Sequence, residues 1–164
     1  MKIIKPLFLS SLFILPFSGK TSAQEIVKRD PLISTLIGQI SSDTLSKYVN
    51  KLVSFGTRST LSNTTDPKTG IGASRKWVLE KFLEFSKKSE GRMTAYLDKW
   101  TLEPDGRRID AKIEMENVMA VMKGTDPTDN RIFMVSGHID SRVTDVMNRT
   151  SDAPGANDDG SGTV

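Results

Sequence analysis

The chain has 164 residues, with 23 Lys and Arg against 20 Asp and Glu, a single His and no Cys. Without cysteine there can be no disulfide and no thiolate metal ligand, so any metal site must use histidine and carboxylates. Residues 1–23 hold three of the lysines and no acid. The rest of the chain is therefore neutral, and it lacks the basic stripe that would indicate nucleic-acid binding.

The first 23 residues have the layout of a secretory signal peptide. Lys2 and Lys5 come before an apolar run from Leu7 to Phe17, and small residues ending at Ala23 supply a cleavage site. The apolar run has eleven residues, whereas a span of the bilayer takes about 20. We therefore expect export to the periplasm or the extracellular space, with cleavage after Ala23 and no membrane attachment afterwards.

Three helices are predicted in the first half of the chain. The first begins at Asp30-Pro31, because Asp is a good N-cap and Pro suits the first helical position. The second begins near 42–43, its apolar period runs from Leu45 to Val53, and Gly56 is placed to end it. The third spans about 71–88, with an apolar face that we expect to pack in the core.

Two arginines in this half have different predicted surroundings. Arg75 belongs to the charged side of the third helix, opposite the apolar face that contains Trp77. Arg58 lies in the polar loop 57–70, where we expect an ordinary surface arginine; contact with a substrate is the alternative. The same loop holds a glycosylation sequon at Asn63, and a second stands at Asn148; both matter only in a eukaryotic secretory pathway.

Strands are predicted after the third helix. Residues 92–102 roughly alternate and fit one strand, and the Glu-Pro-Asp-Gly sequence at 103–106 indicates a turn. A longer strand or strand pair covers about 108–122, and its apolar end is expected to be buried on both faces. Residues 132–135 are apolar and predict another short buried strand, which delivers His138 at its carboxyl end. Helices followed by buried strands indicate an α/β domain, in which ligands gather at the carboxyl ends of strands.

The single histidine stands in the sequence Gly-His-Ile-Asp-Ser. The imidazole of His138 is a good zinc ligand, and Asp140 could accept a hydrogen bond from its second ring nitrogen. Alone this pattern is weak, because His-x-Asp is common and a histidine also caps strand ends. A second element strengthens it: the Gly-rich loop Asn157–Gly160 carries two adjacent aspartates.

This acidic loop could hold either of two kinds of cation. A calcium loop of the EF-hand type needs an acid five positions before its invariant Gly, and that position is Gly155 here, so the pattern fails. A hydrolytic two-metal site needs a carboxylate that bridges cations about 3.5–4 Å apart. One Asp of this loop could provide that bridge beside a strand-end histidine.

Together, Gly-His-x-Asp-Ser at 137–141 and Ala-Pro-Gly-Ala-Asn-Asp-Asp-Gly-Ser-Gly at 153–162 resemble the co-catalytic zinc aminopeptidases of metallopeptidase family 28. The resemblance is sharp over 117–164 and looser over 43–90. It implies that His138 ligates one zinc, that Asp140 supports this histidine, and that Asp158 bridges two zincs. It also implies a three-layer mixed sheet flanked by helices.

The resemblance further implies groups that the chain does not contain. Family members place a catalytic Glu-Glu pair, another Asp and a final His after the bridging Asp, and no such set follows Asp158 here. We therefore expect residues 24–164 to be the N-terminal portion of a zinc-peptidase catalytic domain, inactive by itself. The whole enzyme would be a two-zinc aminopeptidase that acts on peptides, and its oligomeric state stays open.

Other readings of the same residues remain open at this point. One is a binding or receptor-type ectodomain that keeps part of the site on the same fold. Another is a small calcium-stabilised exported domain that uses the acids of 152–159. Within the family, a carboxypeptidase or a glutaminyl-cyclase-like transferase is a further possibility.

Overall fold

The computed structural model describes residues 28–164, so the predicted signal peptide lies outside the described part of the chain. The chain divides into two units at Gln39. Before this division stands α1 (Pro31–Gly38), whose N-cap is Asp30 as predicted. The Asp30 carboxylate accepts hydrogen bonds from the backbone N–H groups of Leu32, at 2.7 Å, and Ile33, at 3.4 Å.

The second unit is built around two helices, α2 (Ser42–Val53) and α3 (Gly70–Ser86). The N-cap of α2 is Ser41, whose hydroxyl accepts a hydrogen bond from the N–H of Thr44. Leu52 and Phe55, at the end of α2, form the buried core with Ala73 of α3. This small core is completed by partly buried side chains from α3 and from the C-terminal part of the chain: Trp77, Val78, Ile139 and Val164.

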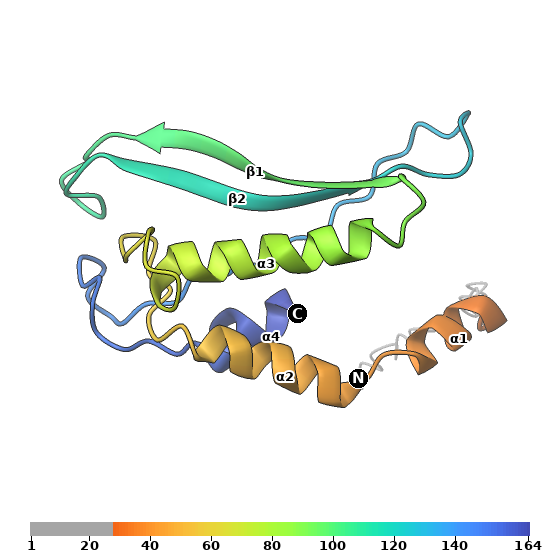
Figure 1. The fold of residues 1–164 in the computed structure, drawn as a ribbon, viewed down its shortest axis with the longest axis horizontal. Coiled ribbons are helices and arrows are strands. Elements are labelled where there is room, and N and C mark those ends of the chain that lie inside the picture. Colours follow the sequence, from red (N-terminus) through yellow and green to blue (C-terminus); the bar gives the residue numbers. More distant parts are fainter. Residues whose placement is uncertain (1–27) are drawn as a thin grey trace, which may run out of the picture. The chain divides into compact units, whose positions relative to one another are not determined.

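A two-stranded antiparallel sheet lies along α3, on the opposite side from α2 (Figure 1). Strand β1 (Met93–Leu102) pairs with β2 (Ile113–Met122) over the full length of both. The prediction for β1 is confirmed, and the second predicted strand begins later than expected, at Ile113. The connecting turn is held by Asp105, whose carboxylate accepts hydrogen bonds from three backbone N–H groups, and these lower its pKa to about 2.

Two strand predictions were wrong for residues 28–164. Residues 132–135 form no strand, and their side chains are 82–98% exposed. The end of β2 is about half exposed at Val121 and Met122 rather than buried on both faces. The first error arises because a strand exists only where a neighbouring strand accepts and donates its hydrogen bonds. Val121 and Met122 do pair with β1, but in the described chain nothing covers their side chains fully. In the described chain β1 and β2 pair only with each other, and the mixed three-layer sheet is not seen.

Two arginine predictions were also wrong, because Arg58 and Arg75 are buried. Arg75 turns from α3 toward the sheet, where its Nη1 lies 4.0 Å from Glu116 of β2. Burial lowers the pKa of Arg75, and the charges of Glu116 and Asp140 oppose this. The helical pattern placed Arg75 on a polar face, but its side chain lies against the hairpin, beside the carboxylate of Glu116.

The C-terminal part of the chain follows a long connection after β2. It closes with a wide turn, η1 (Ala156–Gly160), and the single turn α4 (Ser161–Thr163). The η1 turn packs against α2. Among the helices of residues 28–164, none combines the length and the apolar character of a membrane span.

Candidate metal centre

His138 lies against the acidic loop that follows it in the sequence. The hydroxyl of Thr163 is 3.0 Å from the carbonyl oxygen of His138 and 2.9 Å from that of Asp159, so its single proton can serve either carbonyl. This contact joins the segment around His138 to the end of the loop. The two short motifs, separated in the sequence, therefore form one site.

Three carboxylates surround the His138 imidazole. Its Nδ1 atom is 3.3 Å from Oδ1 of Asp140 and also 3.3 Å from the Asp140 carbonyl oxygen. Its Nε2 atom is 3.3 Å from Oδ1 of Asp158 and 3.7 Å from Oδ2 of Asp159. The structure thus brings together the three residues that the sequence singled out, with Asp140 on one side of the ring and Asp158 on the other.

This arrangement suits zinc on the side that faces Asp158. A proton on Nδ1, donated toward Asp140, leaves the Nε2 lone pair free for a metal. A tetrahedral zinc with a nitrogen ligand at about 2.0–2.1 Å and an oxygen ligand at about 2.0–2.2 Å holds those two atoms about 3.4 Å apart. The 3.3 Å between Nε2 of His138 and Oδ1 of Asp158 fits this spacing. The Asp158 side chain is 93% exposed, so its second oxygen is free to contact another cation.

The described residues supply only part of a metal centre. Among residues 28–164, no group of three or more His, Asp or Glu side chains is arranged to hold one ion. Catalytic zinc normally has three protein ligands. His138 and Asp158 would be its two donors here, and Asp140 would act on a metal only through His138.

Asp159 has a different position from Asp158. Its side chain is largely buried, and its carboxylate lies directly against the backbone of Gly162, where a Cβ atom would collide with it. Only glycine leaves room for this contact. The carboxylate of Asp159 therefore shapes the loop, while that of Asp158 projects into solvent next to His138.

The site is held in place by Arg58, whose role the sequence did not reveal. The side chain is completely buried and donates four hydrogen bonds to backbone carbonyls. Its Nε donates to Ile139 at 2.7 Å, and its Nη2 donates to Gly155 at 3.0 Å. Its Nη1 donates to Leu52 at 2.9 Å and to Pro154 at 2.7 Å. One guanidinium thus joins α2, the segment after His138 and the start of the acidic loop.

Burial lowers the pKa of Arg58, and the negative charge of Asp140 raises it. Arginine stays protonated in proteins, so the guanidinium keeps its full set of donors. No sequence pattern could have identified this role. The partners are carbonyl groups, which every residue carries, and three of them lie 81 to 97 positions away from Arg58.

Ser141 makes a second connection between the same segments. Its hydroxyl donates to the carbonyl of Ala153 at 2.5 Å and accepts from the backbone N–H of Arg58 at 3.2 Å. The N–H of Ser141 donates in turn to the Arg58 carbonyl at 3.3 Å. Gly155 completes this connection: its φ is positive, at 48°, and there is no space for a Cβ atom beside Ser141 and Arg58. We call Arg58, Ser141 and Gly155 the polar clamp.

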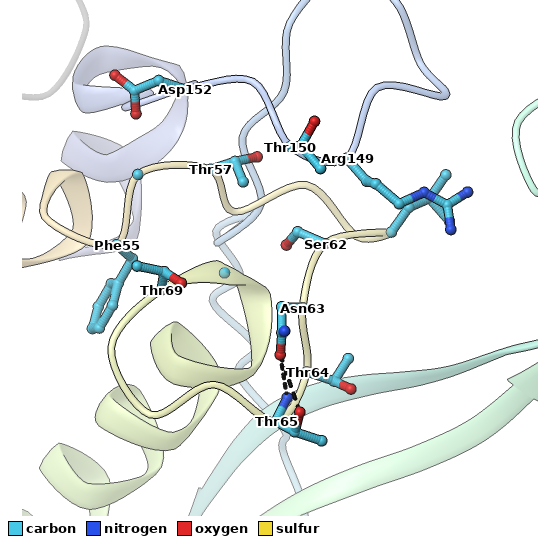
Figure 2. A pocket seen from close by; sticks show the side chains of 13 residues that line it. Phe55, Thr57, Ser62, Asn63, Thr64, Thr65, Thr69, Arg149, Thr150 and Asp152 are labelled. Carbon is cyan, nitrogen blue, oxygen red and sulfur yellow. Dashed lines mark hydrogen bonds between the residues drawn. The ribbon is translucent and has the colours of Figure 1, made fainter.

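A cavity of about 680 Å³ lies elsewhere, between the loop after α2 and the segment 149–152 (Figure 2). Its wall is rich in hydroxyl groups and includes Phe55, Asn63, Thr65 and Asp152. None of His138, Asp140 and Asp158 lines it. The cavity is therefore separate from the candidate metal centre.

Comparisons with known proteins agree with the motifs. Residues 117–164 match the family model described as peptidase family M28. A probable zinc metalloprotease of Leptosphaeria maculans is 43% identical over 132 residues, 80% of this chain and 30% of the relative. A probable zinc metalloprotease of Pyricularia oryzae is 44% identical over 133 residues, 81% of this chain and 26% of the relative.

A third relative, from Pyrenophora teres f. teres, is also a probable zinc metalloprotease. It is 41% identical over 149 residues, 90% of this chain and 31% of the relative. The chain thus spans 26% to 31% of the length of these curated relatives. No solved structure gives a significant match. The family match over the acidic loop, and the similarity to these relatives over most of the chain, show that the chain belongs to peptidase family M28.

Proposed function

We propose that the whole protein is an exported zinc-dependent aminopeptidase in which His138 ligates one of two zinc ions and Asp158 bridges them. One observation carries the proposal: the spacing of 3.3 Å between Nε2 of His138 and Oδ1 of Asp158, with Asp140 behind the opposite ring nitrogen. The relatives described as zinc metalloproteases support zinc and a peptide substrate. The pattern of residues 1–23 supports export.

Each residue of the site has a separate task in this proposal. Zinc, when bound, polarises the scissile carbonyl and activates water. Asp140 accepts a hydrogen bond from Nδ1–H of His138 and so keeps Nε2 available as a ligand. The polar clamp fixes the distance between His138 and the loop that carries Asp158, because Arg58 donates to the carbonyl of Ile139, next to His138, and to that of Gly155, at the start of the loop.

A calcium-stabilised loop is the competing function, and His138 distinguishes the two. Calcium takes oxygen ligands, so calcium binding by the acidic loop would not need an imidazole. A zinc site that uses His138 loses the one imidazole that the described residues provide when this residue is replaced. The close approach of His138 to Asp158 favours zinc.

Metal binding to the chain tests the site directly. We would titrate the purified chain with zinc against a chromophoric chelator, and with calcium by calorimetry. His138→Ala should abolish measurable competition for zinc, and Asp140→Asn should weaken zinc binding by about 10–100-fold. Asp98→Asn, at an exposed acid on β1 whose side chain makes no hydrogen bond or ion pair in the described chain, serves as the control. Calcium binding that His138→Ala leaves unchanged, with no zinc binding, would refute the proposal.

Activity of the whole gene product tests the reaction. We expect hydrolysis of aminoacyl anilides and of short peptides, lost with a chelator and restored by zinc. Acetylation of the peptide N-terminus should abolish cleavage by an aminopeptidase, because the free amine is part of what such an enzyme recognises. Cleavage that survives N-acetylation and releases the C-terminal residue would show a carboxypeptidase instead.

A further inference from the structure

Two Asn-x-Thr sequons remain outside the proposed peptidase chemistry. They begin at Asn63, in the loop before α3, and at Asn148, in the long connection before the acidic loop. Both have threonine at the third position and neither has proline in the middle, so by sequence alone they are equally good acceptors for N-glycosylation. The structure distinguishes them by exposure and by what each side-chain amide contacts.

Asn63 presents its amide nitrogen to solvent. Its carbonyl Oδ1 accepts hydrogen bonds from the backbone N–H groups of Thr65 and Asp66, each at 2.7 Å, and from the Thr65 hydroxyl at 3.2 Å. Within the described residues, its Nδ2 donates no hydrogen bond to protein. Figure 2 shows the amide turned toward Thr65, so the sequon threonine contacts the oxygen and leaves the nitrogen free.

The backbone of this sequon is held by the first turn of α3. The carbonyl of Asn63 accepts a hydrogen bond from the N–H of Gly72 at 3.1 Å, and the Ser62 hydroxyl accepts one from the N–H of Ile71 at 2.9 Å. Asn63 is exposed and lies at the wall of the 680 Å³ cavity. A bulky group on Nδ2 therefore has space, and none of these backbone contacts would have to break.

Asn148 is in the opposite situation. It is half-buried, and its Nδ2 donates to the Ser151 hydroxyl at 2.8 Å. Its Oδ1 accepts from the N–H groups of Thr150 at 3.2 Å and Ser151 at 2.9 Å. The middle residue of the sequon, Arg149, pairs with Asp110 from the hairpin connection. A glycan on this nitrogen would disrupt the turn and the ion pair beside it.

We propose that Asn63 is N-glycosylated in a eukaryotic secretory pathway and that Asn148 is left unmodified. The donor is a lipid-linked oligosaccharide pyrophosphate. Nδ2 of Asn63 forms a bond to the anomeric carbon of the first sugar, the bond from that carbon to the pyrophosphate oxygen breaks, and one amide proton is released. The glycan then stands over the cavity beside α3, away from His138.

The proposal rests on the export proposed above, and the test separates the two. The whole chain is expressed in a yeast secretory host in two forms, with its own residues 1–23 and with the host's leader in their place. N-glycanase removes the glycan and converts the modified Asn to Asp, which peptide mass spectrometry locates. Secreted and retained protein are both analysed, so a protein held inside the cell still gives an answer.

We expect one glycan per chain, at Asn63. Thr65→Ala should remove the whole mobility shift, Thr65→Ser should keep it, and Thr150→Ala, the matched change in the other sequon, should leave it unchanged. A glycan at Asn148, or none at Asn63 in protein that entered the pathway behind the host's leader, would overturn the proposal. A glycan at Asn63 with the host's leader alone would instead overturn export by residues 1–23.

Discussion

The two sides of His138 are held in contrasting ways. After it, the segment 139–141 is fixed to the acidic loop and to α2 by the buried side chain of Arg58. Before it, the four apolar side chains of 132–135 are exposed, and none of their backbone N–H groups donates a hydrogen bond in the described structure. The position of the candidate metal centre is thus set by polar contacts to backbone carbonyls, while the apolar run contributes little.

Charge makes the polar clamp strong. A hydrogen bond that involves an ionised group contributes about 1.5–3 kcal/mol, more than one between neutral groups. Arg58 donates four such bonds from a fully buried position. The small apolar core of Leu52, Phe55 and Ala73 lies beside it, so the clamp and the core stabilise the same part of the chain.

Removal of the guanidinium should produce the largest effect. Arg58→Met keeps an apolar stem and removes the guanidinium from one buried and three part-buried carbonyls. The carbonyls of Leu52 and Gly155 still accept from backbone N–H groups, whereas those of Ile139 and Pro154 lose their donor, at a cost of about 1–3 kcal/mol each. We therefore expect a loss of at least about 3 kcal/mol in the free energy of unfolding, enough to unfold a marginal domain. Urea denaturation followed by circular dichroism measures this loss.

Arg108→Met is the matched control for this change, because Arg108 is exposed in the hairpin connection. It should alter stability by less than about 0.5 kcal/mol. Arg58→Lys should fall between the two, since an ammonium carries the charge but cannot reach all four carbonyls. Equal stability of Arg58→Met and Arg108→Met would show that the clamp does not hold the site.

A smaller effect should follow from loss of the Ser141 hydroxyl. Ser141→Ala leaves the carbonyl of Ala153 and the N–H of Arg58 without a buried partner. We expect a loss of about 1–2 kcal/mol in the free energy of unfolding, while Ser46→Ala, on the exposed face of α2, should be neutral. A neutral Ser141→Ala would mean that the two segments are held by Arg58 alone.

The contrast across His138 also explains which features could be predicted from the sequence. The N-cap at Asp30 and the span of β1 follow from local rules, since N-capping preference and side-chain alternation depend on near neighbours. The grouping of His138, Asp140 and Asp158 was accessible because two short motifs mark it. These features depend on residue type and spacing, which the sequence displays.

The features that sequence reasoning missed depend on distant partners. The apolar run 132–135 has the composition of a strand, but pairing requires another strand at its edge, and composition cannot supply one. Arginine usually lies at the surface, yet Arg58 is buried and donates to backbone carbonyls, and Arg75 is buried beside Glu116. Burial of a charge is decided by its tertiary partner, which sequence periodicity does not show.

The smallest effect is expected in the exposed run 132–135 that precedes His138. The test replaces one apolar side chain with threonine before His138 and another after it. Val135→Thr alters a side chain that is almost fully exposed and should change stability by less than about 0.5 kcal/mol. Ile139→Thr alters a side chain packed against the core and should cost about 1 kcal/mol or more.

Hydrogen exchange read by NMR gives an independent measure of the same contrast. Amides of 132–135 should exchange close to the rate of an unstructured peptide, and the Ser141 amide, bonded to the Arg58 carbonyl, should be protected. Protection of 132–135 together with a destabilising Val135→Thr would show that this run pairs with a partner in solution. In that case strand pairing as well as the polar clamp would position His138, and the two sides of the site would be held alike.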